Sequence, residues 1–436
     1  MPRDSTRHVA RQRSSRRSVL KKVGAISGVS TVGALAGCSQ QGGDGGDGGG
    51  GGGGGGDGGG DGGGDGGDGG GDGGGDTTTM SSDLTEVTIV MPPWYHNIVN
   101  DWMQENGVWK KHFNEAGYEP NIQQTWSGAP LFASGKADIS YMGTIEAART
   151  AASGDLGGIT TYGPALYPEI QWPVRADSQY APSKTGGVQE TFDMLAENND
   201  STLGIYGWAS GTLLLGRIAI NEVYGYNIAQ EGGDFENVVT GHPFAMSDLL
   251  IQGRTDWTHT GPSYGAATYY VNDKFEILFS NNDIWPDEMG AINALNSLTT
   301  RTKFAEQHPE ALQAHVDAWN EGIKWMYDAA ANNMKSLVDR ERNLGTFQAL
   351  IQRSAVELCF DWVFNLNGYL KYRTFTAGKD LYFHDDNIQA EKDALQMVQD
   401  SGFLESGWQD NLTFKTVEPS DTSLPYEAGK SPIQAI

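Results

Sequence analysis

The 436-residue sequence has only two cysteines, Cys38 and Cys359, which excludes the disulfide framework of many small secreted domains. Cys359 lies in SAVELCFDWVF, an apolar stretch with helical spacing, and we expect it to be a buried thiol. Basic residues are scarce as well. From Cys38 onward the chain has 22 Lys and Arg against 54 Asp and Glu, a formal charge near −32. Because phosphate groups are bound by clusters of Lys and Arg, this balance argues against a nucleic-acid partner.

The sequence also lacks the motifs of several enzyme and metal-site classes. It has no Walker loop, no C-x-x-C pair and no H-E-x-x-H, so we expect neither a cofactor nor a metal, and any ATP hydrolysis would belong to a partner. His308 and His315 are seven residues apart rather than the four of the zinc motif. The run His384-Asp385-Asp386 could touch a metal, but we favour a solvated turn.

The first 37 residues are predicted to be an export signal. Arg16 and Arg17 precede an uncharged stretch at 23–36 that is too short and too rich in small residues for a permanent membrane span. SRRSVLK resembles the twin-arginine (Tat) signal, with Val19 at the usual phenylalanine position. LAGC resembles a lipobox, in which Cys38 becomes the lipid-modified first residue of the mature chain. We therefore expect a protein exported by the Tat route and lipid-anchored on the outer face of the cytoplasmic membrane.

A glycine-rich segment follows the proposed anchor. Residues 42–76 hold 27 glycines and 8 aspartates, and nothing in them can bury apolar surface. We expect a flexible tether with a mean reach of roughly 30–35 Å, by the scaling for Gly-rich chains. The acidity of the whole chain resembles that of proteins from extreme halophiles, and an ordinary acidic secreted protein is the alternative.

Strand and helix signals alternate in the remaining part, about residues 84–419. Residues 86–91 predict a strand, 97–116 a helix and 121–126 a second strand. Such alternation is typical of a mainly parallel sheet with helices on both faces. No internal membrane span is predicted.

Two segments of this part match one another. LFASGKADISYMG starts at residue 131 and LLIQGRTDWTHTG at residue 249, and each has an apolar turn followed by G-x-x-D. The glycine ends a helix in the left-handed conformation, and a short strand follows at once. Each strand then ends at a glycine, Gly143 or Gly261, that leads into another helix. The repetition predicts two lobes built on one plan.

A third unit completes the candidate site. A strand at 202–206 leads through small residues into a helix at 213–224. Ligands of open α/β sheets bind at the carboxyl ends of strands, where helix N-termini present free N–H groups. The strand-end loops and one irregular stretch give the predicted ligand-binding residues: Trp94, Tyr95, Gly143, Thr144, Trp208, Ser210, Gly211, Thr212, Pro262, Ser263 and Trp285.

These residues leave the charge of the solute open. The aromatic rings could stack on a ring or face a cation, or pack in the core. The Ser and Thr residues could equally be plain helix caps. Arg175 is the one candidate for a Lys or Arg in the strand-end loops. An anion would then depend mainly on helix N-termini, so an uncharged, cationic or zwitterionic solute competes with it.

Several segments together resemble the substrate-binding proteins of nitrate/sulfonate/taurine-type ABC importers, including thiamine-precursor relatives. They are EVTIVMPPWYHN, LFASGKADISYMG, GIYGWASGTLLLGRIAINEVYGYN, LLIQGRTDW and TTRTKFAEQHPEALQAHVDAWNEGIKWM. The resemblance covers about residues 86–326. It implies a type II periplasmic-binding-protein fold, with two α/β lobes, a hinge and an interlobe ligand cleft. It also implies delivery of the solute to ABC permease subunits served by a separate ATPase. Trp208 departs from the serine-rich turn of that family.

From these signals we expect five regions along the chain. They are a signal peptide (1–37), the lipidated cysteine and tether (38–82), lobe 1 (83–177 and 280–419), lobe 2 (178–279) and a disordered tail (420–436). We expect a monomer that is not an enzyme. Two alternatives stay open. One is the receptor of a TRAP transporter. The other is a secreted serine hydrolase, because Gly261, Ser263 and Gly265 spell G-x-S-x-G, the pattern of a nucleophile elbow.

Overall fold

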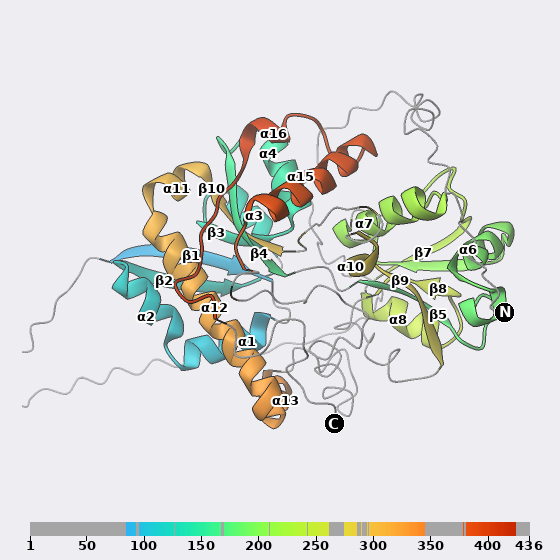
Figure 1. Cartoon of the computed structure of the whole chain (residues 1–436), viewed down its shortest axis with the longest axis horizontal. Helices are drawn as coiled ribbons and strands as arrows, with labels where there is room; N and C mark the ends of the chain where they lie inside the picture. Colours follow the sequence, from blue (N-terminus) through green and yellow to red (C-terminus); the bar gives the residue numbers. More distant parts are fainter. Residues whose placement is uncertain are drawn as a thin grey trace, which may run out of the picture. The chain divides into compact units, whose positions relative to one another are not determined.

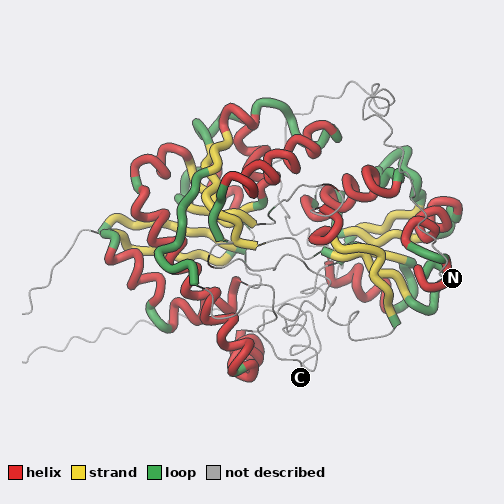
Figure 2. The backbone as a smooth tube through the Cα atoms, in the orientation of Figure 1, coloured by secondary structure: helices red, strands yellow, loops and turns green. Residues whose placement is uncertain are grey.

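The computed structural model describes residues 84–92, 96–125, 127–166, 170–208, 210–241, 243–260, 274–285, 289, 294, 296–344, 378 and 381–423. Within them the chain forms two separate sheets, each with its own helices (Figures 1 and 2), which confirms the predicted α/β class. Several predicted features lie outside the described residues: Arg16, Arg17, Cys38, the glycine-rich tether, Trp94, Tyr95, Pro262, Ser263 and Cys359.

The first sheet has the strand order β11-β4-β10-β3-β1-β2. Its strands are β1 (Thr85–Met91), β2 (Tyr118–Gln124), β3 (Ile139–Met142), β4 (Ile159–Leu166), β10 (Asn296–Arg301) and β11 (Leu412–Phe414). β1 runs parallel to β2 and β3, and β11 runs parallel to β4. β10 lies antiparallel between β3 and β4, so the sheet is mixed, although most of its pairs are parallel.

The helices of this lobe are α1 (His96–Glu105), α2 (Val108–Glu115), α3 (Gly128–Ala133), α4 (Thr144–Ser153), α11 (Thr302–Gln307), α12 (Pro309–Asn332), α13 (Met334–Leu344), α15 (Asp385–Asp400) and α16 (Trp408–Asn411). The single helix expected at 97–116 is two helices. Gly107 separates them with φ 66°, a left-handed conformation that a continuous helix does not allow.

The helix predicted after His308 is confirmed as α12. It packs against α1 and α2 (Figure 1) and buries Leu312, Val316 and Trp319 completely. Its outer side holds the start of the predicted tail. The Ser420 backbone N–H donates to Asp317 (2.6 Å), and Lys324 pairs with Asp421.

The second sheet has the order β7-β6-β8-β5-β9. Its strands are β5 (Gln171–Arg175), β6 (Thr202–Ile205), β7 (Asn237–Thr240), β8 (Trp257–Thr258) and β9 (Phe275–Ser280). Its helices are α5 (Pro182–Thr185), α6 (Val188–Glu197), α7 (Gly211–Ala219) with the π-helical turn η1 (Ile220–Tyr224), α8 (Pro243–Ile251) and α10 (Asn281–Ile284). Because β5 pairs with β8 and β9, the chain enters this sheet before the boundary predicted at residue 178.

The two G-x-x-D segments have the same structural role, one in each sheet. Gly135 and Gly253 both have left-handed backbones, with φ 75° and 69°. The aspartate three residues later then accepts a backbone N–H from the neighbouring parallel strand. Asp138 Oδ2 lies 3.0 Å from the Thr88 nitrogen, and Asp256 Oδ2 lies 2.8 Å from the Thr202 nitrogen. The repeated motif thus ties β3 to β1 and β8 to β6.

A membrane-spanning helix is not found in the part of the chain that the structure describes; none of its helices combines the required length and hydropathy.

Candidate functional site

One edge of the second sheet gathers the residues that could meet a ligand. The parallel strands β6 and β8 end there, at Ile205 and Thr258. β5 is antiparallel to β8, so it begins at the same edge with Gln171. Gln171 exchanges two backbone hydrogen bonds with Thr260, of 2.7 and 2.8 Å. Asn281, which follows the end of β9, donates its backbone N–H to Ile170 just before β5. We call this the strand-end edge.

Helix α7 begins at the strand-end edge. The hydroxyl of Ser210 caps it by accepting the Leu213 N–H at 3.5 Å, as the capping alternative predicts. Asn281 joins the helix to the sheet: its side-chain amide donates to the Thr212 carbonyl (3.3 Å) and accepts from the Trp172 indole N–H (3.1 Å). Among the described residues, no atom lies within 4 Å of a Cβ built on Gly211. The start of α7 is therefore firmly positioned, and its described neighbours leave room beside Gly211.

The equivalent helix start in the first lobe is filled by the chain itself. The backbone N–H of Thr144 donates to the Ala294 carbonyl at 3.3 Å, and the Thr144 hydroxyl lies 3.0 Å from that of Ser297. The Glu391 carboxyl, from α15, accepts the Ala294 N–H at 2.8 Å. Burial raises the pKa of Glu391 to about 8 despite this bond. Gly143 and Thr144 thus lie at a strand end as predicted, but Thr144 is fully buried.

Trp208 lies beside a cation that the sequence did not indicate. The Arg217 guanidinium is 5.6 Å from the centroid of the Trp208 ring and 4.4 Å from that of Phe403. Burial lowers the pKa of Arg217. Its Nε has no hydrogen-bond partner among the described residues. In the sequence, Arg217 is the isolated charge of the apolar helix GTLLLGRIA rather than a loop residue.

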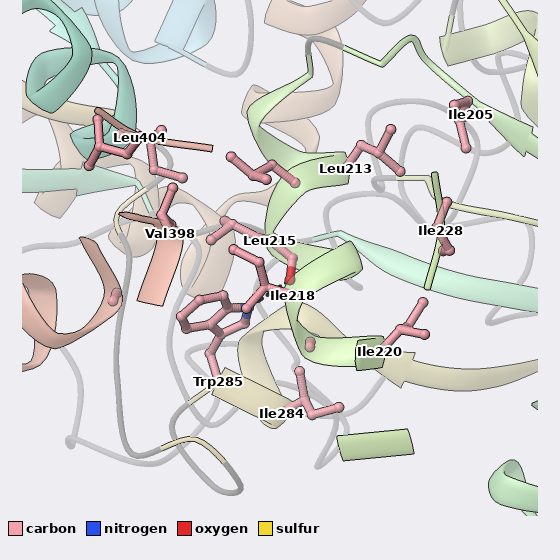
Figure 3. Close-up of a cluster of buried hydrophobic side chains, with 14 of the residues drawn as sticks. Ile205, Leu213, Leu215, Ile218, Ile220, Ile228, Ile284, Trp285, Val398 and Leu404 are labelled. Carbon is pink, nitrogen blue, oxygen red and sulfur yellow. Dashed lines mark hydrogen bonds between the residues drawn. The ribbon is translucent and has the colours of Figure 1, made fainter. Parts of the chain in front are cut away.

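The predicted residue Trp285 and the basic residue Arg175, which the sequence analysis considered, lie away from the strand-end edge. Trp285 is buried, and its indole N–H donates to the Leu215 carbonyl at 3.2 Å. Figure 3 shows its ring beside Leu215 and Ile218, an environment typical of a core residue. Arg175 ends β5 at the opposite edge and is paired with Asp177 (Nε to Oδ1, 2.8 Å), so it supplies no charge to the strand-end edge.

Two buried polar residues at the strand-end edge were missed. The His259 ring lies against Tyr206 and Trp172, at centroid distances of 3.8 and 5.4 Å. Burial lowers the pKa of His259 to about 3, so the ring is neutral. Neither ring nitrogen has a hydrogen-bond partner in the described part of the chain, and the same holds for both polar atoms of the Gln171 amide. The signal was the alternation of Trp257 and His259, which places both on one face of the strand.

Other places in the described residues are poorer candidates. A hollow of about 760 Å³ lies between α1 and α13, but Arg340 on its wall is already paired with Asp101 and Glu105. In the described residues no group of three His, Cys, Asp or Glu side chains is placed to hold a metal. His384 is the N-cap of α15, and its backbone N–H donates to the Asn387 side chain at 2.7 Å, so the run His384-Asp385-Asp386 opens a helix rather than forming the expected turn.

No family model matches the chain, and no curated protein matches it in sequence. Solved structures do match. The periplasmic aliphatic sulphonate binding protein SsuA from Escherichia coli has a TM-score of 0.53 and 11% identity, covering 79% of this chain and 96% of that one. The periplasmic nitrate-binding protein NrtA from Synechocystis PCC 6803 has a TM-score of 0.50 and 12% identity, covering 76% and 86%. At these identities the likeness establishes the fold alone. The chain has the two-sheet α/β fold of these periplasmic binding proteins.

Proposed function

We propose that this protein is an extracytoplasmic receptor that binds a small organic or anionic solute. The observation that carries the proposal is the start of α7. It is fixed by Asn281, has no described atom within 4 Å of a Cβ built on Gly211, and lies at the carboxyl ends of two parallel strands. Helix N-termini at such edges present free N–H groups and the positive end of the helix dipole to a ligand. The names of SsuA and NrtA, which share the fold, describe receptors for a sulphonate and for nitrate.

The second lobe contributes more to this site than the first. The start of α7 in the second lobe offers Gly211 and Thr212, and Trp208 and Ser210 lie just before it. The start of α4 in the first lobe is instead occupied by the Ala294 carbonyl. We therefore assign the main contacts with the solute to the second lobe. Gly143 would approach from the first lobe. Trp94, Tyr95, Pro262 and Ser263 stay predicted contacts, because each belongs to a strand-end loop in the sequence.

Anchoring and delivery complete the proposal. Arg16, Arg17 and Cys38 would direct Tat export and lipid attachment, and the glycine-rich tether would let the receptor reach its membrane partner. That partner would be an ABC permease with a separate ATPase, and the receptor would act as a monomer. A TRAP membrane subunit is the alternative partner, and cross-linking in membranes followed by mass spectrometry separates the two.

Calorimetric titration of the purified full-length protein tests the binding function. The panel is nitrate, taurine, isethionate, glycine betaine and the hydroxymethylpyrimidine precursor of thiamine. We expect at least one to bind with a dissociation constant in the micromolar range or tighter. If none binds, and none shifts the thermal unfolding midpoint, the receptor proposal is wrong.

A Cys38→Ser variant tests the anchor. We expect the wild-type protein in the membrane fraction with a lipid-modified Cys38 peptide, and the variant in the soluble exported fraction. An unmodified Cys38 in a soluble wild-type protein would contradict the anchor and leave solute binding untouched.

A serine hydrolase fits the described residues less well. Of the histidines that follow Ser263, His315 is buried with a tyrosine hydroxyl at each ring nitrogen. His308 lies beside Tyr118, at the edge of the first sheet where the parallel strands begin. A fluorophosphonate probe that labels wild-type protein but not Ser263→Ala would favour the enzyme.

A further inference from the structure

Two buried histidines of this chain have opposite surroundings. Both are completely buried, and burial lowers the pKa of each to about 3. His315, in the first lobe, has Tyr141 Oη 2.9 Å from its Nε2 and Tyr162 Oη 2.6 Å from its Nδ1. His259, at the strand-end edge, has no partner for either nitrogen in the described part of the chain. His315 thus has a hydrogen-bond partner at each ring nitrogen, as expected for a structural histidine. The unpartnered nitrogens of His259 need another explanation.

Gln171 has the same unusual property at the same edge. Within the described residues, Gln171 and His259 are the side chains that leave two polar atoms buried without a partner. Their positions are related through the backbone, because Gln171 pairs with Thr260, the residue after His259. Side chains alternate between faces of a sheet, so Gln171 and His259 reach the strand-end edge from opposite faces. Buried polar groups in native proteins almost always have partners, including ligands and ordered water.

We propose that His259 and Gln171 are specificity-determining residues that hydrogen-bond uncharged polar groups of the solute, such as a hydroxyl, carbonyl, amide or ring nitrogen. The inference rests on the proposed receptor function and narrows its solute class. A neutral imidazole offers one donor and one acceptor, and an amide offers both kinds as well. Each side chain can therefore bind a solute group that donates, accepts or does both.

The surroundings explain why that part of the solute carries no charge. The His259 ring contacts Tyr206 and Trp172. Gln171 is paired across the sheet with Thr260 and Ser280. None of these carries a charge. A charged group buried here would lack a counter-ion, which makes its transfer from water strongly unfavourable. A charged end of the same solute would instead meet the open start of α7.

A matched pair of solutes tests this chemistry on the full-length protein. Isethionate and ethanesulfonate share a sulfonate and a two-carbon chain, but only isethionate has a hydroxyl. We expect calorimetry to give at least tenfold tighter binding of isethionate. The hydroxymethylpyrimidine precursor of thiamine serves as a second probe, with two ring nitrogens and no sulfonate. Equal binding of the sulfonate pair, together with no binding of the pyrimidine, overturns the inference.

Variants then assign the effect to the two residues. We expect His259→Phe and Gln171→Met each to weaken binding of the tighter probe at least tenfold, and to leave the thermal unfolding midpoint unchanged or higher, because each removes unpartnered polar atoms. The control His315→Phe should lower the midpoint and leave the affinity within twofold. Unchanged affinity in the first two variants overturns the inference while the receptor proposal stands. Loss of binding together with a lowered midpoint marks a structural role and overturns it as well.

Nitrogen NMR of the histidine rings gives a readout that does not depend on variants. Adding the tighter probe should shift both ring nitrogens of His259 and leave those of His315 in place. If the His259 signals do not move, ordered water rather than the solute is hydrogen-bonded to its ring nitrogens, which contradicts the inference. If no probe in either panel binds the wild-type protein, the receptor function itself is wrong, and the inference is overturned with it.

Discussion

The Nδ1 atom of His315 lies 2.6 Å from the hydroxyl of Tyr162, inside the core of the first lobe. The bond joins the long helix α12 to strand β4, and a second tyrosine, Tyr141 of β3, closes the other side of the ring. Trp109 stacks on the same imidazole at a centroid distance of 5.6 Å. Since all these groups are buried, the histidine replaces every hydrogen bond that it loses to water.

Removing the Tyr162 hydroxyl should therefore destabilise the protein. Tyr162→Phe leaves one ring nitrogen of His315 buried and unpaired, which costs about 1–3 kcal/mol. Urea denaturation followed by tryptophan fluorescence measures the loss. The control is Tyr118→Phe, whose hydroxyl lies 3.3 Å from His308 in a part-buried position and should matter much less. Equal effects of the two variants would contradict this account.

Glu391 should make stability fall as the pH rises. Its pKa is about 8 in the folded protein, against 4.5 for the free side chain, so folding retains a proton that the unfolded chain releases above 4.5. The stability that this proton supplies is complete below pH 4.5 and is lost as the pH rises through 8. Glu391→Gln keeps an acceptor for the Ala294 N–H without the titration. We expect similar stabilities at pH 5 and a variant more stable by roughly 2–4 kcal/mol at pH 9. A constant difference across this range would show that Glu391 does not titrate.

Replacing either aspartate of the two G-x-x-D segments should destabilise the protein by a similar amount. Asp138→Ala and Asp256→Ala each remove a charge-assisted bond to a backbone N–H of the neighbouring strand. Such bonds contribute about 1.5–3 kcal/mol. We expect both variants to lose stability in that range in urea denaturation, whereas Asp155→Ala, at an exposed turn, should change it little. If only one of the two variants, Asp138→Ala or Asp256→Ala, loses stability, the two motifs are not equivalent.

Two glycines of α7 should respond to alanine in opposite ways. A Cβ at Gly216 would lie 2.1 Å from the Trp172 ring, so Gly216→Ala should cost about 1–3 kcal/mol through overpacking. The added Cβ of Gly211→Ala meets no described atom within 4 Å, so this variant should keep its stability within ~0.5 kcal/mol. If the solute approaches the helix start, Gly211→Ala should still weaken its binding severalfold. Unchanged affinity in Gly211→Ala would argue against that approach.

The sequence was most informative where a backbone requirement selects a residue type. Gly135 and Gly253 lie in left-handed turns, and the aspartates that follow them bind a backbone N–H of the neighbouring parallel strand, so the repeated motif revealed two similar sheets. The same reasoning was incomplete at Gly107. Apolar spacing at 97–116 continues across that glycine, although its left-handed backbone ends the helix.

The candidate site was harder to predict, because distant contacts decide which strand-end residues stay open. Thr144 and Thr212 look equivalent in the sequence, yet Ala294 and Glu391 fill the space beside Thr144 alone. Trp285 was predicted from an irregular stretch, but it directly follows the short helix α10 and turns into the core to reach the Leu215 carbonyl. His259 has a polar side chain on a buried face, and its lack of hydrogen-bond partners among the described residues, on which the proposal for it rests, becomes visible only in three dimensions.

The sheet topology also sets an order of events during synthesis. All strands of the second sheet lie in one continuous stretch, 171–280, whereas the first sheet waits for β10 and finally β11. About 250 residues separate Ile159 of β4 from its partner Leu412, which takes on the order of tens of seconds at ~5–20 residues per second. The second lobe can fold while β4 still has an unpaired edge. Until β11 arrives, that edge is open to pairing with other chains, and a nascent-chain chaperone would have its greatest effect there.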